Sequence, residues 1–109
     1  MAKFEKSISG NFNQILSKIE NGILNGSISA SLEEQSDFRS GDAQCSVRVF
    51  ERYSYFGGNR VSLSVTLFQN ADEPIRVSAI STGGSQAVFF KVNTVGEEAF
   101  LDKLKEILE

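Results

Sequence analysis

The feature that most constrains this chain is a strict alternation of apolar and polar residues between positions 43 and 67. A period of two places successive side chains on opposite faces of a strand. The pattern therefore predicts two neighbouring strands with one buried face and one wetter face. The apolar positions of the predicted buried face are Ala43, Cys45, Val47, Val49, Val61, Leu63, Val65 and Leu67.

Loop lengths set the expected register, because a shift of one residue moves every side chain to the other face of the sheet. A three-residue loop at positions 57–59 (Gly-Gly-Asn) keeps odd-numbered residues opposite one another,. A two-residue Gly83-Gly84 turn brings even-numbered residues of a following strand opposite odd-numbered ones. The predicted partners are Tyr55 and Val61, Tyr53 and Leu63, Val49 and Leu67, Ala79 and Val88, and Val77 and Phe90.

The remaining segments complete an α+β pattern. Apolar residues recur at helical spacing from Phe12 to Leu24, with Asn11 as the predicted N-cap and Gly26 just past the end,. A second helix is expected near the C-terminus, where Thr94 and Glu97 have capping-box spacing,. Residues 35–42 are polar and predict a loop. Strands are expected at residues 2–9, 27–34, 43–56, 60–69, 75–82 and 87–93.

These elements predict a single α+β domain over residues 1–109, in the order β-α-β-β-β-β-β-α. Two helices with one apolar stripe each must cover a sheet face, so we expect an antiparallel sheet of five to six strands with both helices on one side. The order also fits a reduced helix-grip arrangement, in which a curved sheet wraps the C-terminal helix. A chain this short would then enclose only a small cavity.

Composition argues against several classes of function. A net charge of −3 without a basic cluster argues against nucleic-acid binding,. No apolar run reaches the about 20 residues that span a bilayer, so we expect no membrane role and a cytoplasmic location. The chain has no histidine, which removes the commonest general base and zinc ligand, and we expect no enzyme activity, metal or cofactor,. The lone Cys45 is expected to be a small core residue.

Glu51 is the carboxylate that stands out. Its odd number places it on the predicted buried face, between Val49 and Tyr53, where an unpaired charge is costly,. The strand could outrun its helical cover and leave Glu51, Tyr53 and Tyr55 at a wet rim. A bulge near Phe50 could instead turn the carboxylate outward. The third hypothesis is that these three residues line the mouth of a pocket for a small apolar ligand, between the sheet and the C-terminal helix.

The predicted wet face carries more large apolar residues than a solvated face needs. Serines, threonines and arginines there are mixed with phenylalanines, a composition that occurs at protein interfaces. A solvated face and an interface remain equal alternatives, and a homodimer is the simplest partner hypothesis. The candidate interface residues are Phe50, Arg52, Phe68, Ile80 and Phe89.

Three segments together resemble a family of short uncharacterised bacterial proteins, found mostly in Gram-positive organisms. They are residues 48–60 (RVFERYSYFGGNR), residues 78–91 and the helix start at residues 96–101. The resemblance covers nearly the whole chain. It implies a bacterial cytosolic origin and supplies no assigned activity or catalytic residue. We therefore expect a non-catalytic interaction module, with small-molecule binding as the alternative and an acid-only enzyme using Glu51 as a third.

Overall fold

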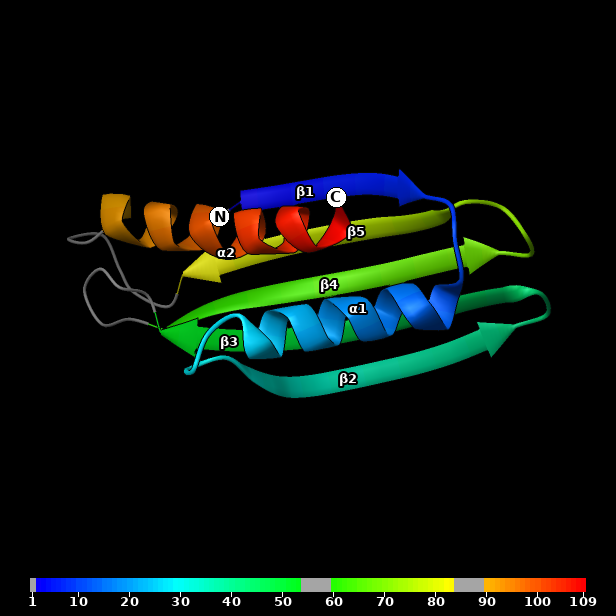
Figure 1. Cartoon of the computed structure of the whole chain (residues 1–109), viewed down its shortest axis with the longest axis horizontal. Coiled ribbons are helices and arrows are strands. Elements are labelled where there is room, and N and C mark those ends of the chain that lie inside the picture. Colours follow the sequence, from blue (N-terminus) through cyan, green and yellow to red (C-terminus); the bar gives the residue numbers. More distant parts are fainter. Residues whose placement is uncertain (1, 54–59, 84–89) are drawn as a thin grey trace.

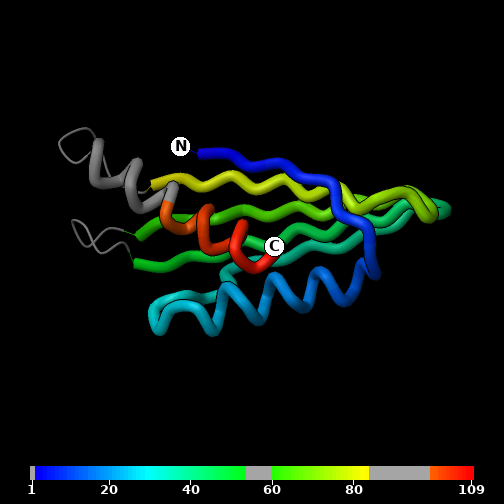
Figure 2. Tube along the Cα trace, turned by 45° about the horizontal axis from the view of Figure 1, so that its top comes forward, coloured from blue at the N-terminus to red at the C-terminus, as the bar shows by residue number. Residues whose placement is uncertain are grey.

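The computed structural model describes residues 2–53, 60–83 and 90–109, with residues 90–98 described as backbone only. The described elements confirm the α+β class: five antiparallel strands form one sheet in the order β1-β5-β4-β3-β2 (Figure 1). Both helices lie on the same side of this sheet (Figure 2). The elements are β1 (Ala2–Ile8), α1 (Phe12–Asn25), β2 (Ser31–Ser40), β3 (Ala43–Tyr53), β4 (Arg60–Asn70), β5 (Ile75–Gly83) and α2 (Phe90–Leu108).

Helix α1 begins and ends where the sequence predicts. The Asn11 side chain accepts a hydrogen bond from the Gln14 backbone N–H at 3.0 Å, which satisfies one of the free donors of the first turn,. Gly26 follows the last helical residue but adopts right-handed φ and ψ, so the predicted left-handed C-terminal turn is absent there. The buried residues of its apolar stripe are Phe12, Leu16, Ile19 and Ile23.

Gly22 lowers the intrinsic helix propensity of α1, and the packing of α2 explains why a glycine stands there. A Cβ atom at Gly22 would lie 2.5 Å from Cδ1 of Ile107 in α2, and one at Gly26 would lie 2.4 Å from Cε of Lys103. Both distances are far inside van der Waals contact. Gly22 therefore lets the two helices approach closely, whereas Gly26, which follows α1, faces the flexible end of the Lys103 side chain.

Helix α2 begins earlier than predicted. It starts at Phe90, so the predicted strand at residues 87–93 is wrong for residues 90–93, and Thr94 lies inside the helix. The predicted pairing of Ala79 with Val88 is also wrong, because Ala79 already pairs with Val65 on one side and Phe4 on the other. Residues 84–89, including Gly84 and Val88, lie outside the described ranges.

Strand β2 lies further along the chain than predicted. The segment expected to be a loop forms most of this edge strand, and the turn to β3 consists of Gly41 and Asp42 alone. Gly41 takes φ +58°, a left-handed conformation that glycine tolerates best,. Ile28, which lies within the predicted strand at residues 27–34, sits in the turn before β2 and is fully exposed. Most residues of β2 are polar and are exposed on both faces of the strand. The segment therefore lacks the alternating apolar pattern that predicts a strand.

The register between β3 and β4 reverses the predicted faces of β3. Val49 lies opposite Ser64 and Tyr53 opposite Arg60, so the predicted partners Leu67 and Leu63 are wrong. Even-numbered residues of β3 instead share a face with the odd-numbered residues of β4. That shared side, covered by α1 and α2, is called the helix face below, and the opposite side is called the open face.

The core lies between the helix face and the two helices. Phe50 is completely buried opposite Leu63, and Arg48 lies opposite Val65 on the same side. Cys45, Val47 and Val49 alternate with these residues and therefore lie on the open face, where they are half-buried,. The prediction that Cys45 is a core residue is wrong for this reason. The large residues of the core are Leu16, Ile19, Ile23, Phe50, Leu63, Leu67, Phe100 and Leu104.

Among the described residues, neither helix has the length and hydropathy of a membrane span.

Candidate functional site

Of the predicted ligand-binding residues, Glu51 and Tyr53 are described, and neither lines a pocket under α2. Because β3 is reversed, Glu51 lies on the open face, where its Oε1 forms an ion pair with Arg60 Nη2 at 2.7 Å. Its other oxygen is 3.4 Å from the Ser62 hydroxyl. The β3–β4 ladder runs without a shift, so no bulge at Phe50 is responsible. The register shift of the sheet lies in β2, between Leu32 and Glu34.

Tyr53 is exposed at the end of β3. Its ring lies 5.7 Å from the Arg60 guanidinium carbon, and its backbone N–H donates to the Ser29 hydroxyl at 3.1 Å. Tyr55 lies outside the described residues. The structure thus joins Glu51 and Tyr53 through Arg60 on the open face, which is a different environment from the predicted pocket mouth.

Two of the predicted interface residues belong to the helix face. Phe50 is fully buried in the core, and the Arg52 guanidinium carbon stacks 4.4 Å from the ring centroid of Phe100 in α2. The described turns of α2 fill the space above this part of the sheet, since Phe100, Leu101 and Leu104 are at most 4% exposed. Assigning Phe50 and Arg52 to an outer surface was wrong because it followed from the reversed parity of β3.

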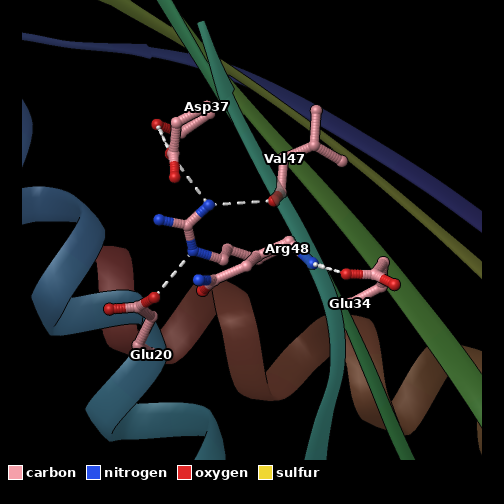
Figure 3. A network of polar contacts seen from close by, with 7 residues as sticks. Glu20, Glu34, Asp37, Val47 and Arg48 are labelled. Carbon is pink, nitrogen blue, oxygen red and sulfur yellow. Dashed lines mark hydrogen bonds and ion pairs between the residues drawn. The ribbon is translucent and has the colours of Figure 1, made fainter.

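A polar cluster around Arg48 lies between α1 and the β2–β3 hairpin (Figure 3). Arg48 Nε donates to Glu20 Oε2 at 2.7 Å, and Nη1 donates to Asp37 Oδ1 at 2.9 Å and to the Val47 carbonyl at 3.0 Å. The Ser46 hydroxyl also donates to Asp37 Oδ1, at 2.6 Å. With its side chain only 7% exposed, Arg48 is a buried cation held by two carboxylates from different elements.

The electrostatics of this cluster favour the charged forms of Asp37 and Arg48. The hydrogen bond from Ser46 and that from Arg48 hold the pKa of Asp37 below its usual value. Burial would lower the pKa of Arg48, but its hydrogen bonds to Glu20 and Asp37 outweigh burial and raise it. Neither the lowered pKa of Asp37 nor the raised pKa of Arg48 favours proton exchange near neutral pH. The cluster is therefore suited to holding α1 against the β2–β3 hairpin. The sequence analysis missed it, although an arginine on an inward-facing strand position requires such partners.

A groove of about 500 Å³ adjoins the Arg48 cluster. Its apolar side comes from Phe12 and Leu16 of α1, and its polar side includes Asn13, Arg39 and Gln44. Arg39 Nη2 donates to Gln44 Oε1 at 3.1 Å, so part of the polar lining is internally satisfied. This groove is the second candidate location for a ligand on the described chain.

The open face carries the other predicted interface residues. Phe68 and Ile80 are each 40% exposed there, and Phe38 of β2 is 60% exposed. Strand register arranges the face as rows that cross the sheet from β2 to β1. Three rows include one residue from each of the five strands: Glu34-Val49-Ser64-Ile80-Lys3, Ser36-Val47-Thr66-Ser78-Glu5 and Phe38-Cys45-Phe68-Arg76-Ser7.

A hollow of about 430 Å³ opens on this face at β4, β5 and β1. Thr66, Phe68, Arg76, Ser78 and Ser7 contribute to its lining. Beside it, burial and then the charge of Asp37 raise the pKa of the Cys45 thiol, which disfavours the reactive thiolate,. Phe89 lies outside the described residues. Apolar side chains and a hollow thus occur together on a face that no described element covers.

Comparison with known proteins gives a family and no assigned activity. No curated protein and no solved structure matches the chain. The sequence model of a family described as "Family of unknown function (DUF6054)" matches residues 1–109. Resemblance of the whole chain to an uncharacterised family is thereby confirmed, and the protein belongs to the DUF6054 family.

Proposed function

We propose that this protein is a non-catalytic interaction module that forms a homodimer through its open face. The observation that supports the proposal most is the concentration of partly exposed apolar side chains on that face. Scattered apolar residues are normal on a surface, but several large apolar side chains on one uncovered sheet face are typical of an interaction site. The apolar members are Phe38, Val47, Val49, Phe68 and Ile80.

The area of the face is suitable for self-association. Five strands at about 4.8 Å spacing, with about nine residues each at about 3.3 Å, present about 700 Å². Stable specific interfaces bury about 800 Å² per partner. The composition is also suitable, because serine and threonine hydroxyls on the face can pair with each other or with trapped water while the apolar residues lose contact with water.

The non-catalytic part of the proposal is supported by the state of the charged groups. The chain has no histidine, and its best-placed carboxylates are engaged in ion pairs, Glu51 with Arg60 and Asp37 with Arg48. A general acid or base needs a group that can exchange a proton near the working pH. The sequence resemblance adds a bacterial cytosolic setting to the proposal.

The mass of the protein in solution tests the homodimer. Sedimentation equilibrium over a concentration series should show a dimer for the parent protein. Phe68→Ser and Ile80→Ser should each shift the mass towards the monomer, because each removes apolar area from the open face. Ile28→Ser is the matched control, since Ile28 is equally apolar and fully exposed but lies in the turn before β2. A parent protein that is monomeric at every concentration would refute the homodimer.

Small-molecule binding is the second candidate, and the structure favours a different location for it than the sequence did. The groove beside Arg48 combines an apolar wall with a polar one, whereas the described turns of α2 fill the space first predicted. Native mass spectrometry of protein purified from its own host would report stoichiometry and any retained ligand together. A retained small molecule that Leu16→Trp displaces would support this candidate, because the larger side chain would fill the groove.

A further inference from the structure

The rows of residues on the open face are sufficient to orient the two copies of the proposed dimer, and this inference rests on the proposed function. We propose that the second copy is related by a two-fold axis nearly parallel to β4. The β1–β5 half of each sheet then lies over the β3–β2 half of the other. In this arrangement Phe38 of each copy enters the hollow beside Arg76 of the other.

The first support is charge complementarity across the sheet. A two-fold axis along β4 places each row of one sheet over the same row of the other sheet. Within each pair of rows, the strands run across the sheet in opposite order. Lys3 of one copy then lies over Glu34 of the other, at opposite edges of their sheets. Ile80 lies over Val49 in the same row, so an apolar pair is next to a charge pair. Symmetry produces each of these contacts twice.

The second support is the match between a protruding ring and a hollow. In the row that contains Phe38, the two-fold axis places Phe68 over its own counterpart and Phe38 over Ser7, at the edge of the hollow. Phe38 is the most exposed apolar side chain of the open face. No ion pair joins Arg76 to another described residue, so its guanidinium is available to stack on an inserted ring,.

A two-fold axis perpendicular to β4 is the competing arrangement, and it pairs the exposed Phe68 ring and the Glu51 carboxylate poorly. With the axis between the Ser64 and Thr66 rows, it exchanges the Phe68 row with the Glu51–Ser62 row, so Phe68 lies over Ser62 and the Glu51 carboxylate over Cys45. The two middle rows exchange as well, which places Lys3 over Glu5 and Val49 over Val47. Packed sheets tolerate about 30° between strand directions, so either axis is sterically available. Contact chemistry therefore decides between them, and it favours the axis along β4.

Charge exchange tests this register. Lys3→Glu and Glu34→Lys should each raise the dimer dissociation constant about tenfold, because each puts like charges together at two symmetric sites. Combining the two should restore the parent value. Lys3→Glu with Glu5→Lys is the matched control, because it restores only the ion pair within one chain, Lys3 Nζ to Glu5 Oε1 at 3.9 Å, and should leave the dissociation constant raised. Rescue by the Glu5→Lys partner and not by Glu34→Lys would overturn the proposed register.

Cross-linking gives an independent test of the axis, in a Cys45→Ser background. Facing sheets are about 10 Å apart, too far for a disulfide, so a short bismaleimide is the appropriate reagent. Ser64 lies on the axis and faces itself, and Ser64→Cys should cross-link efficiently. In the proposed dimer, Ser36 of one copy lies four strand spacings, about 19 Å, to the side of Ser36 of the other copy. Ser36→Cys should therefore not cross-link.

The outcomes separate the orientation from the dimer itself. Efficient cross-linking of Ser36→Cys in a protein with dimer mass would refute the axis along β4 and leave the homodimer standing. A monomer mass for the Cys45→Ser background and for the parent would refute the homodimer. Labelling of both cysteines by a monofunctional maleimide after unfolding confirms that each thiol was available to react. Equal circular dichroism spectra confirm that both variants fold.

Discussion

The two faces of the sheet contain similar residues and differ in what covers them. Each face has β-branched side chains, serines and phenylalanine, and each has an arginine paired with carboxylates. On the helix face α1 and α2 bury this set, and Arg48 is only 6% exposed. On the open face Arg60 is half exposed and Phe38 extends into solvent. Cover by helices, and not the apolar content of a strand, therefore decides which face is the core.

The largest expected difference between the faces is at two phenylalanines. Phe50→Ala should lower the free energy of unfolding by about 3–5 kcal/mol, because it leaves a cavity in the filled core,. Phe68→Ala should lower the free energy of unfolding of the monomer by less than about 1 kcal/mol, since its ring is 40% exposed,. Urea unfolding of dilute monomer measures both values. Equal losses would show that the open face is covered in solution by part of the chain itself.

A smaller difference is expected at the two arginines. Arg48→Met should lower the free energy of unfolding by about 2 kcal/mol, because it leaves Glu20 and Asp37 without their buried cation,. Arg60→Met should change it by less than about 1 kcal/mol, since the pairs of Arg60 with Glu51 and Glu33 are solvent-exposed,. Thermal unfolding of both variants at low protein concentration tests this pair. A larger loss at Arg60 would contradict the contrast between the two faces.

Asp37 should make the stability of the protein depend on acidity. Because its pKa is below the usual value of 3.8 in the folded protein, the unfolded chain takes up its proton first as the pH falls,. The stabilisation is complete at neutral pH and is lost as the pH falls through and below that value. Asp37→Asn should therefore flatten the acid limb of a plot of unfolding free energy against pH. An unchanged acid limb in Asp37→Asn would show that other carboxylates produce it.

The smallest expected contrast is at two serines. The Ser81 hydroxyl is completely buried and has no hydrogen-bond partner in the described structure, so Ser81→Ala should raise the free energy of unfolding by about 1 kcal/mol,. Ser64→Ala, on the open face, should stay within about 0.5 kcal/mol of the parent. Differential scanning calorimetry resolves shifts of this size. A destabilised Ser81→Ala would mean that its hydroxyl has a partner in solution.

Much of the fold could be predicted because several segments carry unambiguous local patterns. The helical spacing from Phe12 and the Asn11 cap placed α1 correctly, and the alternation at Val61 to Leu67 placed β4 and its buried face. The strongly β-forming residues near Phe90 were misleading, because α2 extends over them. Local propensity is weak where a helix can instead lie against a sheet.

The orientation of β3 could not be obtained from its own residues. Cys45, Val47 and Val49 are more apolar than Ser46 and Arg48, so the strand by itself favours the wrong face. Its actual face is set by contacts from elsewhere, with Glu20 of α1 and Asp37 of β2 neutralising Arg48. Those contacts join residues that are 28 and 11 positions apart. For the same reason, the predicted site residue Glu51 lies on the open face and not on the predicted buried face.

The position of β1 beside β5 also determines the order in which the chain can fold. Ala2 pairs with Ser81, so β1 cannot join the sheet until β5 has formed. Strands β2 to β5 neighbour one another in sequence order and can assemble first. During synthesis at about 5–20 residues per second, β1 would wait about 4–15 s for its partner strand. The N-terminal strand is thus the closing strand of the sheet, and its pairing reports completion of the whole sheet.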